Sequence, residues 1–557
     1  MNQPEPQALG FSAVLNDIER GHIKVPQFQR DFVWTKEKSA KLLDSILKEY
    51  PIGTFILWKT KEQLRVVRNL GSFALPETPE GDFVEYVLDG QQRLTSLVAS
   101  VRGLTIRRED REDDFSQIFV DLSAKDGAEV VLTDVTGRAR NSLITIKDLV
   151  SGGITTFAAY PTEYHKRLKE YQKRLLSYSF SVVLVREAPL EVVTEIFTRI
   201  NVTGQPLSVF EIMVAKTFDA KKNFDLMERF EQLAERLREV NYDTISPAVI
   251  LQAAAAVMCQ KCATKDILQL DKNQFIEQWP HIVEALYAAV DYFRNLYRIP
   301  VSRLLPYASL LVPFSYFFYK HPDRPTDAKR QYLEDLFWRT ALAGRYSHSL
   351  ETRLGQDIER VNQILKGEPS TFDYAVDVRP NFILENGWFN AGRSFVKAIL
   401  CLLAYQEPKS FVDNSIVRIS NDWLKRANSK NYHHFFPRAF LERAGVDQVR
   451  INNIVNITVV DDFLNKREIR ANTPSVYMSR SRERNVTLNT AMATHLIEPD
   501  SDGVWTDDYD TFLNQRAQRL SVELASRIIP RDSDSEGQGI NMDDYEEPEV
   551  QDETASA

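Results

Sequence analysis

The spacing of apolar residues changes along this chain, and that change limits the fold more than any other sequence feature. Up to residue 215, short apolar runs typical of strands alternate with runs of helical spacing. From 216 to 425 the spacing follows almost entirely the 3.6-residue period of helices. From 426 to 530 a strand-like run returns, followed by a short helical stretch. The sequence therefore predicts an α+β protein with several domains.

Residues 1–215 are predicted to form an α/β or α+β domain. The segment 38–50 has helical spacing, with its apolar face at Leu42, Leu43, Ile46 and Leu47. Strand-like runs occur at 53–58, 83–88, 118–122, 129–132 and 180–185. Because a strand leads into a helix at 84–101 and again at 180–200, we expect the helices to cover a sheet.

Residues 216–425 are predicted to form a helical scaffold without catalytic residues. Five segments have helical spacing, at 224–240, 246–263, 274–296, 332–343 and 351–365. The most apolar segment, 304–319, is too short to cross a bilayer and contains Pro306 and Pro313. We expect it to be a core helix.

The net charge of −9 lies in the last 27 residues. Residues 531–557 contain ten acidic side chains and one arginine, so the rest of the chain has no net charge. A neutral body can carry a basic groove, and the acidic segment is predicted to be a disordered tail. The beginning of the chain lacks a signal-peptide pattern, and there are three cysteines, so we expect a cytoplasmic protein.

A histidine pair opens the most informative motif, NYHHFFPRAFLE, which is followed by NNIVNITVVDDFLNKRE. Hydrolysis of a phosphodiester with one metal needs a base for water and a cation with open positions. Adjacent side chains of an extended segment point to opposite sides, so one of His433 and His434 can face a metal and the other the water. The run 454–460 supplies a returning strand, and the next segment a helix that presents Asn465. The alternative is two histidines that lie beside aromatic residues by chance.

A second motif, VEYVLDGQQRLTSLVASV, places a turn between a strand and a helix. Backbone N–H groups at a helix start favour an anion, and Gly90 allows a ligand to approach closely. Arg93 can donate two hydrogen bonds to a phosphate, and Asp89 can hold a metal or a ribose hydroxyl. The amides of Gln91 and Gln92 can orient water or a base. A surface turn followed by a helix explains the same residues without a ligand.

The histidine motif resembles the HNH, or ββα-metal, nucleases, and more narrowly the C-terminal domain of GmrSD-type restriction proteins. That resemblance implies that His434 is the general base and His433 a metal ligand. It also implies that Asn456 orients the base or braces the loop, that Asn465 is the second metal ligand, and that Lys466 or Arg467 contacts DNA phosphate. Many relatives carry an acidic residue in place of His433, but imidazole also ligates divalent metals.

Four earlier segments resemble the ParB/sulfiredoxin-like domain at the N-terminus of GmrSD-type proteins: VPQFQRDFVW, LLDSILKEYPIG, VLDGQQRLTSL and IFTRINVTGQPLSVFEI. The later GRYSHSLETRL, at 344–354, resembles the helical extension of that domain. The resemblance implies nucleotide binding by Asp89, Gly90, Gln91, Gln92 and Arg93, with Arg30, Arg199 and Asn201 in second rank. Arg30 and Asn201 serve equally well as a structural ion pair or cap.

Together these resemblances imply a type IV-like restriction endonuclease that acts in phage defence. Its C-terminal domain, 426–530, is expected to cleave DNA, commonly modified phage DNA, with Mg²⁺ or a similar ion. Its N-terminal domain is expected to bind, and often hydrolyse, a nucleoside triphosphate that regulates the cut. Two alternatives stay open: a non-catalytic nucleic-acid-binding regulator, and an enzyme that only hydrolyses NTP. A homo-oligomer also stays open.

Overall fold

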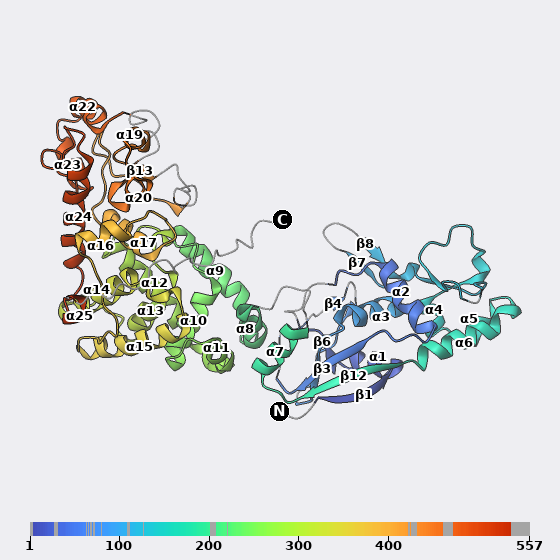
Figure 1. Cartoon of the computed structure of the whole chain (residues 1–557). Coiled ribbons are helices and arrows are strands. Elements are labelled where there is room, and N and C mark those ends of the chain that lie inside the picture. The colour runs from blue at the N-terminus through green and yellow to red at the C-terminus, as the bar shows by residue number, and fades with distance from the viewer. Residues whose placement is uncertain are drawn as a thin grey trace. The chain divides into compact units, whose positions relative to one another are not determined.

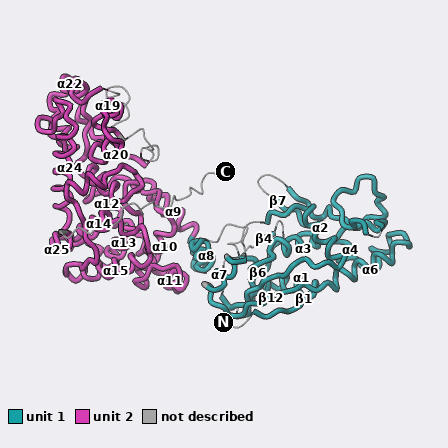
Figure 2. Tube along the Cα trace, viewed as in Figure 1, with its two compact units in different colours: residues 1–226 teal, residues 227–557 magenta. Residues whose placement is uncertain are grey.

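Two compact units, residues 1–226 and 227–557, make up the chain (Figure 1, Figure 2). The computed structural model describes residues 4–26, 32–62, 64, 66, 69–70, 73–79, 81–107, 112–125, 127–200, 208–219, 221–421, 424, 432–460 and 472–535. The first unit mixes strands and helices, and the second is mainly helical. The α+β character and the helical middle region are therefore confirmed. The second unit contains the predicted C-terminal domain and all of the predicted scaffold except residues 216–226, which belong to the first unit.

A five-stranded mixed sheet organises the first unit (Figure 1). Its order is β1 (Glu5–Gly10), β12 (Ser179–Arg186), β3 (Thr54–Thr60), β6 (Val84–Asp89) and β2 (Ile23–Lys24). The β12–β3 and β6–β2 pairs are parallel, whereas β1–β12 and β3–β6 are antiparallel. This order brings the end of β6, which carries Asp89, beside β3.

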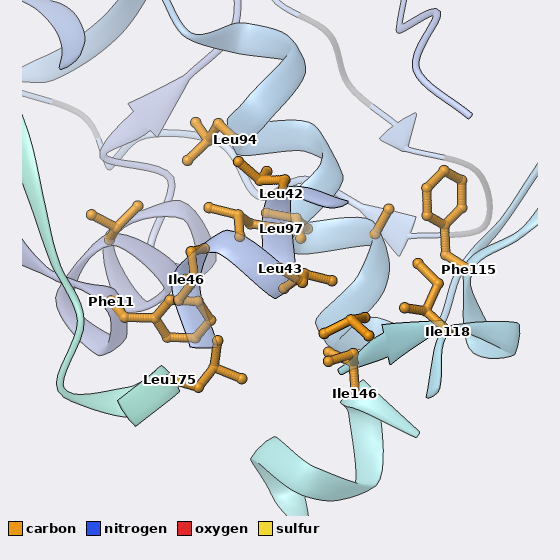
Figure 3. Packing of buried hydrophobic residues seen from close by; sticks show 14 of the residues in the cluster. Phe11, Leu42, Leu43, Ile46, Leu94, Leu97, Phe115, Ile118, Ile146 and Leu175 are labelled. Atoms are coloured by element: carbon orange, nitrogen blue, oxygen red, sulfur yellow. The ribbon is translucent and has the colours of Figure 1, made fainter. Parts of the chain in front are cut away.

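Eight α-helices lie among the described residues of the first unit, and five of the eight contribute buried side chains to its hydrophobic core. The eight are α1 (Phe11–Glu19), α2 (Lys36–Leu47), α3 (Gln91–Arg102), α4 (Ile146–Ser151), α5 (Ile154–Ala158), α6 (His165–Leu176), α7 (Leu190–Ile200) and α8 (Val209–Thr217). Figure 3 shows the predicted face of α2, with Leu42, Leu43 and Ile46, among side chains of α1, α3 and α6. The Thr35 hydroxyl accepts the Lys38 N–H and so caps the start of α2.

Short strands complete the first unit. A three-stranded sheet has the order β10 (Val131–Leu132), β9 (Phe119–Asp121), β11 (Leu143–Thr145), and two hairpins join β4 (Asn69–Leu70) to β5 (Phe73–Ala74) and β7 (Thr105–Arg107) to β8 (Glu112–Asp114). The side chain of Val120 on β9 is fully buried. All five strand-like runs predicted from the sequence contain strands.

The second unit begins with a helical region. Its helices are α9 (Leu226–Glu239), α10 (Pro247–Cys259), α11 (Thr264–Gln269), α12 (Lys272–Asn295), α13 (Leu311–Lys320), α14 (Asp327–Leu342), α15 (Leu350–Lys366), α16 (Pro380–Asn386) and α17 (Ser394–Tyr405). The apolar segment 304–319 includes most of α13, which packs against α10, α12 and α15. Pro313 lies in the first turn of α13, where a missing N–H costs no helical hydrogen bond. Among the described residues, no helix has the length and apolar character needed to cross a membrane.

The remainder of the second unit holds a small hairpin among helices (Figure 1). The elements are β13 (Tyr432–His434), α19 (Arg438–Arg443), α20 (Gln448–Ile451), β14 (Ile457–Val459), α22 (Pro474–Arg484), α23 (Leu488–Ala493), α24 (Tyr509–Ala525) and α25 (Asp532–Ser535).

The acidic C-terminal segment begins with ordered structure. Asp534 on α25 accepts two hydrogen bonds from the fully buried Arg339 guanidinium, at 2.9 and 2.6 Å. The composition of 531–557 predicts disorder throughout, because it contains almost no large apolar residues. An ion pair supplies the anchor that apolar burial does not, and residues 536–557 lie outside the described part of the chain.

Candidate functional site

The histidine pair lies on a hairpin, as the motif predicts. In the antiparallel pair of β13 with β14, His433 is opposite Thr458 and His434 is opposite Ile457. The predicted strand 454–460 begins with one turn of 3₁₀ helix at Ile454–Asn456, because the Asn453 side chain accepts the Val455 N–H. The hairpin packs against α17 and α24, and the Phe435 ring stacks on Phe512 at 4.9 Å between centroids. These contacts fix the backbone that presents both histidines.

Asn456 braces the turn that follows the histidines. Its fully buried side chain accepts the Phe436 N–H at 2.9 Å and donates to the carbonyls of Phe436 and Ile451, both at 3.1 Å. Its own carbonyl accepts the Phe435 N–H. Of the two roles expected for Asn456, this geometry matches the brace of the loop.

His433 is buried, with 4% of its surface exposed. The Thr458 hydroxyl donates to the His433 carbonyl at 3.2 Å, so its oxygen is left to accept the Nδ1–H of the ring at 3.3 Å. The Nε2 atom then carries the lone pair. Burial, with the nearby His434 and His495, lowers the pKa of His433 to about 3. A neutral imidazole of this kind is the form that ligates a metal.

His434 is half-buried, and its Nε2 atom lies 3.1 Å from Asn452 Oδ1. Burial lowers the pKa of His434; the hydrogen bond to Asn452 opposes this shift, and the positive charge of Arg438 adds to it. A lowered pKa keeps the ring neutral at pH 7 and able to accept a proton. The two adjacent histidines thus differ in exposure, because neighbouring side chains on a strand point to opposite sides.

The donor set fits a divalent cation only in part. A neutral imidazole at His433 suits such an ion, but the described residues contain no group of three or more His, Cys, Asp or Glu side chains placed to hold one. Asn465, the predicted second ligand, lies outside the described residues, as do Lys466 and Arg467. An asparagine ligand such as Asn465 is not one of the four residue types that define such a group.

Three residues that the motif analysis missed support the hairpin. Arg516 on α24 is fully buried and donates to the carbonyls of Val455 and Ile457 at 2.5 and 2.7 Å. The Tyr477 hydroxyl donates to the Phe435 carbonyl at 2.6 Å, and Asn452 contacts His434. Asn452 lies within the quoted motif, but its spacing from His434 corresponds to no local structure. Arg516 and Tyr477 lie beyond the motif, and nothing in the sequence marks them.

The second candidate site is the turn between β6 and α3. Gly90 has φ +97°, and a Cβ atom there would lie 2.4 Å from the Phe55 ring. A glycine is therefore needed both for the left-handed backbone and for the close contact with β3. The turn places the N-terminus of the twelve-residue helix α3 directly after Asp89.

The side chains of this turn mostly contact the fold itself. Arg93 donates to the carbonyls of Ile52 and Thr54 at 2.9 and 3.0 Å, and to Asp89 Oδ2 at 2.9 Å. Gln92 accepts the Val33 N–H at 2.8 Å and donates to Gln91. Asp89 is the most exposed of the five, with 36% of its side chain accessible. Arg93 therefore holds the turn onto β3, and Asp89 is the side chain most accessible to a ligand.

The second-rank residues divide into described and undescribed positions. Arg199 near the end of α7 is 78% exposed and pairs with Glu195 at 2.6 Å, one helical turn earlier. Arg30 and Asn201 lie outside the described residues. The structure thus brings Asp89 to Arg93 together on one turn, whereas the ion pair of Arg199 is with a residue of its own helix.

Comparison with known proteins gives two similarities. The chain is 23% identical, over 520 residues, to an uncharacterized protein of Methanocaldococcus jannaschii, covering 83% of this chain and 85% of that protein. This alignment is long enough to include parts of both units. Residues 11–218 match the family described as GmrSD restriction endonuclease, N-terminal domain, and this range lies within the first unit. Over nearly its whole length, the first unit is therefore similar to the N-terminal domain of GmrSD restriction endonucleases.

Proposed function

We propose that this protein is a metal-dependent DNA endonuclease of a type IV-like restriction system, with its catalytic centre on the β13–β14 hairpin. The observation that carries the proposal is the pair of adjacent histidines on one strand of this hairpin, one buried and one half-buried. His434 takes a proton from water, and His433 with Asn465 holds a cation such as Mg²⁺. When bound, the cation stabilises charge on the phosphate. Lys466 or Arg467 contacts DNA phosphate.

The restriction-type N-terminal unit supports the choice of DNA as the substrate. A nuclease that acts on its host's DNA is harmful, so coupling between the two units would protect the cell. The N-terminal unit binds a nucleoside triphosphate at the β6–α3 turn and hydrolyses it. The nucleoside triphosphate binds at the accessible Asp89 carboxylate and at the backbone N–H groups that begin α3. A cytoplasmic location and action on modified phage DNA belong to the same proposal.

Cleavage of plasmid and phage DNA, with and without base modification, tests the nuclease. We expect the full chain to cut at least one DNA with Mg²⁺ and to lose the activity in excess EDTA. His434→Ala should be inactive. His281→Ala is the matched control, because His281 is exposed and lies on α12, outside the hairpin. Equal cutting by His434→Ala and His281→Ala would contradict the proposed centre.

Phosphate release from a panel of nucleoside triphosphates tests the first unit. Asp89→Asn should reduce the release, while Asp134→Asn, at an exposed aspartate of the same unit, should not. Asparagine keeps the shape of the side chain and removes its charge. Release unaffected by either change would remove Asp89 from the nucleotide site.

A non-catalytic nucleic-acid-binding regulator is the second candidate. The observation that favours it is the burial of His433, the proposed metal ligand, which is only 4% exposed. Retained DNA binding with no cutting under any metal or nucleotide condition would select this candidate.

A further inference from the structure

We infer that Asn452 is a positioning residue, which holds the His434 ring in the tautomer with its proton on Nε2 and its lone pair on Nδ1. This inference deepens the proposed nuclease, and its relevance to cleavage depends on that proposal. The contact on which it rests is the 3.1 Å distance between His434 Nε2 and Asn452 Oδ1.

The orientation of the Asn452 amide decides which partner donates. Its Nδ2 group donates to the Phe389 carbonyl at 3.3 Å, which places the Oδ1 atom toward His434. An amide oxygen can only accept, so the ring must offer its Nε2–H. In a neutral imidazole the other nitrogen then has the lone pair. Nδ1 is therefore the atom that can take a proton from water.

The backbone around Asn452 is fixed by the segment between α16 and α17. The Phe389 N–H donates to the Asn452 carbonyl at 2.8 Å, and the Ile454 N–H donates to the Gly387 carbonyl at 2.7 Å. Trp388 and Asn453 form the antiparallel bridge between these two bonds. A Cβ atom on Gly387 would lie 2.6 Å from the Asn453 side chain, so the two segments are in close contact.

These hydrogen bonds between 387–389 and 452–454 form a short ladder, which connects His434 through Asn452 to the helical region. Phe389 and Asn452 are 63 residues apart in sequence. The helical region contains no proposed catalytic residue, but through the Asn452 amide it orients the ring of His434, the proposed base. An outer partner that orients a functional imidazole contributes roughly ten- to hundredfold to activity. Asn452→Leu, which removes the acceptor at similar size, should lower kcat by that factor and leave KM for DNA unchanged.

The direct test is nitrogen NMR of the full-length, ¹⁵N-histidine-labelled chain in EDTA at a pH where neutral imidazole predominates. The His434 signals are assigned by their loss in His434→Gln. We expect the unaltered chain to carry its ring proton on Nε2. Asn452→Leu should redistribute the proton between the nitrogens, and N452D, which keeps an acceptor oxygen, should restore the Nε2–H form and most of the cleavage rate.

Asn453→Ser is the matched control for folding. The Asn453 amide donates to the Leu384 carbonyl at 2.7 Å and supports the same ladder, and its recorded hydrogen bonds do not involve His434. We expect this variant to lower Tm while the tautomer and the cleavage rate stay those of the unaltered chain. An Asn452→Leu variant that lowers Tm but keeps the Nε2–H form and the full kcat would overturn the inference. If the unaltered chain cuts no DNA, the nuclease proposal alone fails. The NMR measurement of the His434 tautomer still tests whether Asn452 orients that ring.

Discussion

The Asn456 side-chain oxygen accepts the Phe436 N–H at 2.9 Å, across 20 positions of sequence. The same amide donates to the carbonyls of Phe436 and Ile451, so one fully buried side chain satisfies two backbone groups in the turn after the histidines and one at the end of α20. No water is needed to satisfy those groups. The Asn456 amide is therefore a main support of the turn that follows His434.

Asn456→Ala should lower the free energy of unfolding of the full chain by about 3 kcal/mol, since it leaves buried backbone groups without partners. Urea denaturation checks this value. Val486→Ala, at a side chain 94% exposed, is the control and should change little. A loss no larger than that of the control would mean that Asn456 does not brace the turn.

Stability should fall on acidification because two buried histidines, His495 and His433, have lowered pKa values. His495 is not one of the proposed catalytic pair and is the one to test. This ring is 1% exposed, its Nε2 lies 2.9 Å from the Lys409 carbonyl, and burial lowers its pKa to about 4. Between the unfolded-state pKa of about 6.5 and this folded value, the unfolded chain binds more protons, so stability decreases as the pH falls. The loss of unfolding free energy that His495 causes is absent above pH 7 and approaches about 3 kcal/mol near pH 4.

His495→Gln keeps an N–H donor for Lys409 and does not titrate. Urea denaturation from pH 7.5 to pH 4 should therefore show a flatter pH dependence for this variant than for the unaltered chain. Identical slopes would show that His495 is not the group responsible.

Gly90→Ala should destabilise the first unit by about 2 kcal/mol, because the added methyl meets the Phe55 ring in a left-handed backbone. Gly81→Ala is a close control: Gly81 has φ +89°, and no atom lies within 4 Å of its added Cβ. Thermal denaturation should thus show a larger loss at Gly90. Equal losses of stability in the two variants would show that the close contact with Phe55 is not a reason for the glycine at position 90.

Truncation should locate the true end of the second unit. A chain ending at Ser535 keeps the Asp534–Arg339 pair, whereas a chain ending at Pro530 leaves Arg339 without that partner. Breaking a buried pair costs about 3 kcal/mol. We expect the longer chain to match the full chain in urea denaturation and the shorter to fall below it; equal stability of the two would contradict the anchor.

Local patterns predicted much of the fold because local physics determines it. Apolar spacing located α2, α10 and α12, and the order of histidines and Asn456 predicted the β13–β14 hairpin. The pairing of Asn452 with Phe389 and of Asp534 with Arg339 joins residues far apart in sequence, and neither pair has a local signature. Nor does sequence show that Arg93 binds backbone carbonyls of β3 and the preceding loop, because the same guanidinium chemistry serves a phosphate equally well.

In the proposed nuclease, His434 performs the chemistry of DNA cleavage and is not needed to bind DNA. Binding and cutting of one labelled duplex, measured in the same samples with Mg²⁺, test it most directly. We expect equal Kd for the unaltered chain and His434→Ala, with product formed by the unaltered chain alone. Product formation by His434→Ala at the unaltered rate, or a parallel loss of binding and cutting, would contradict it.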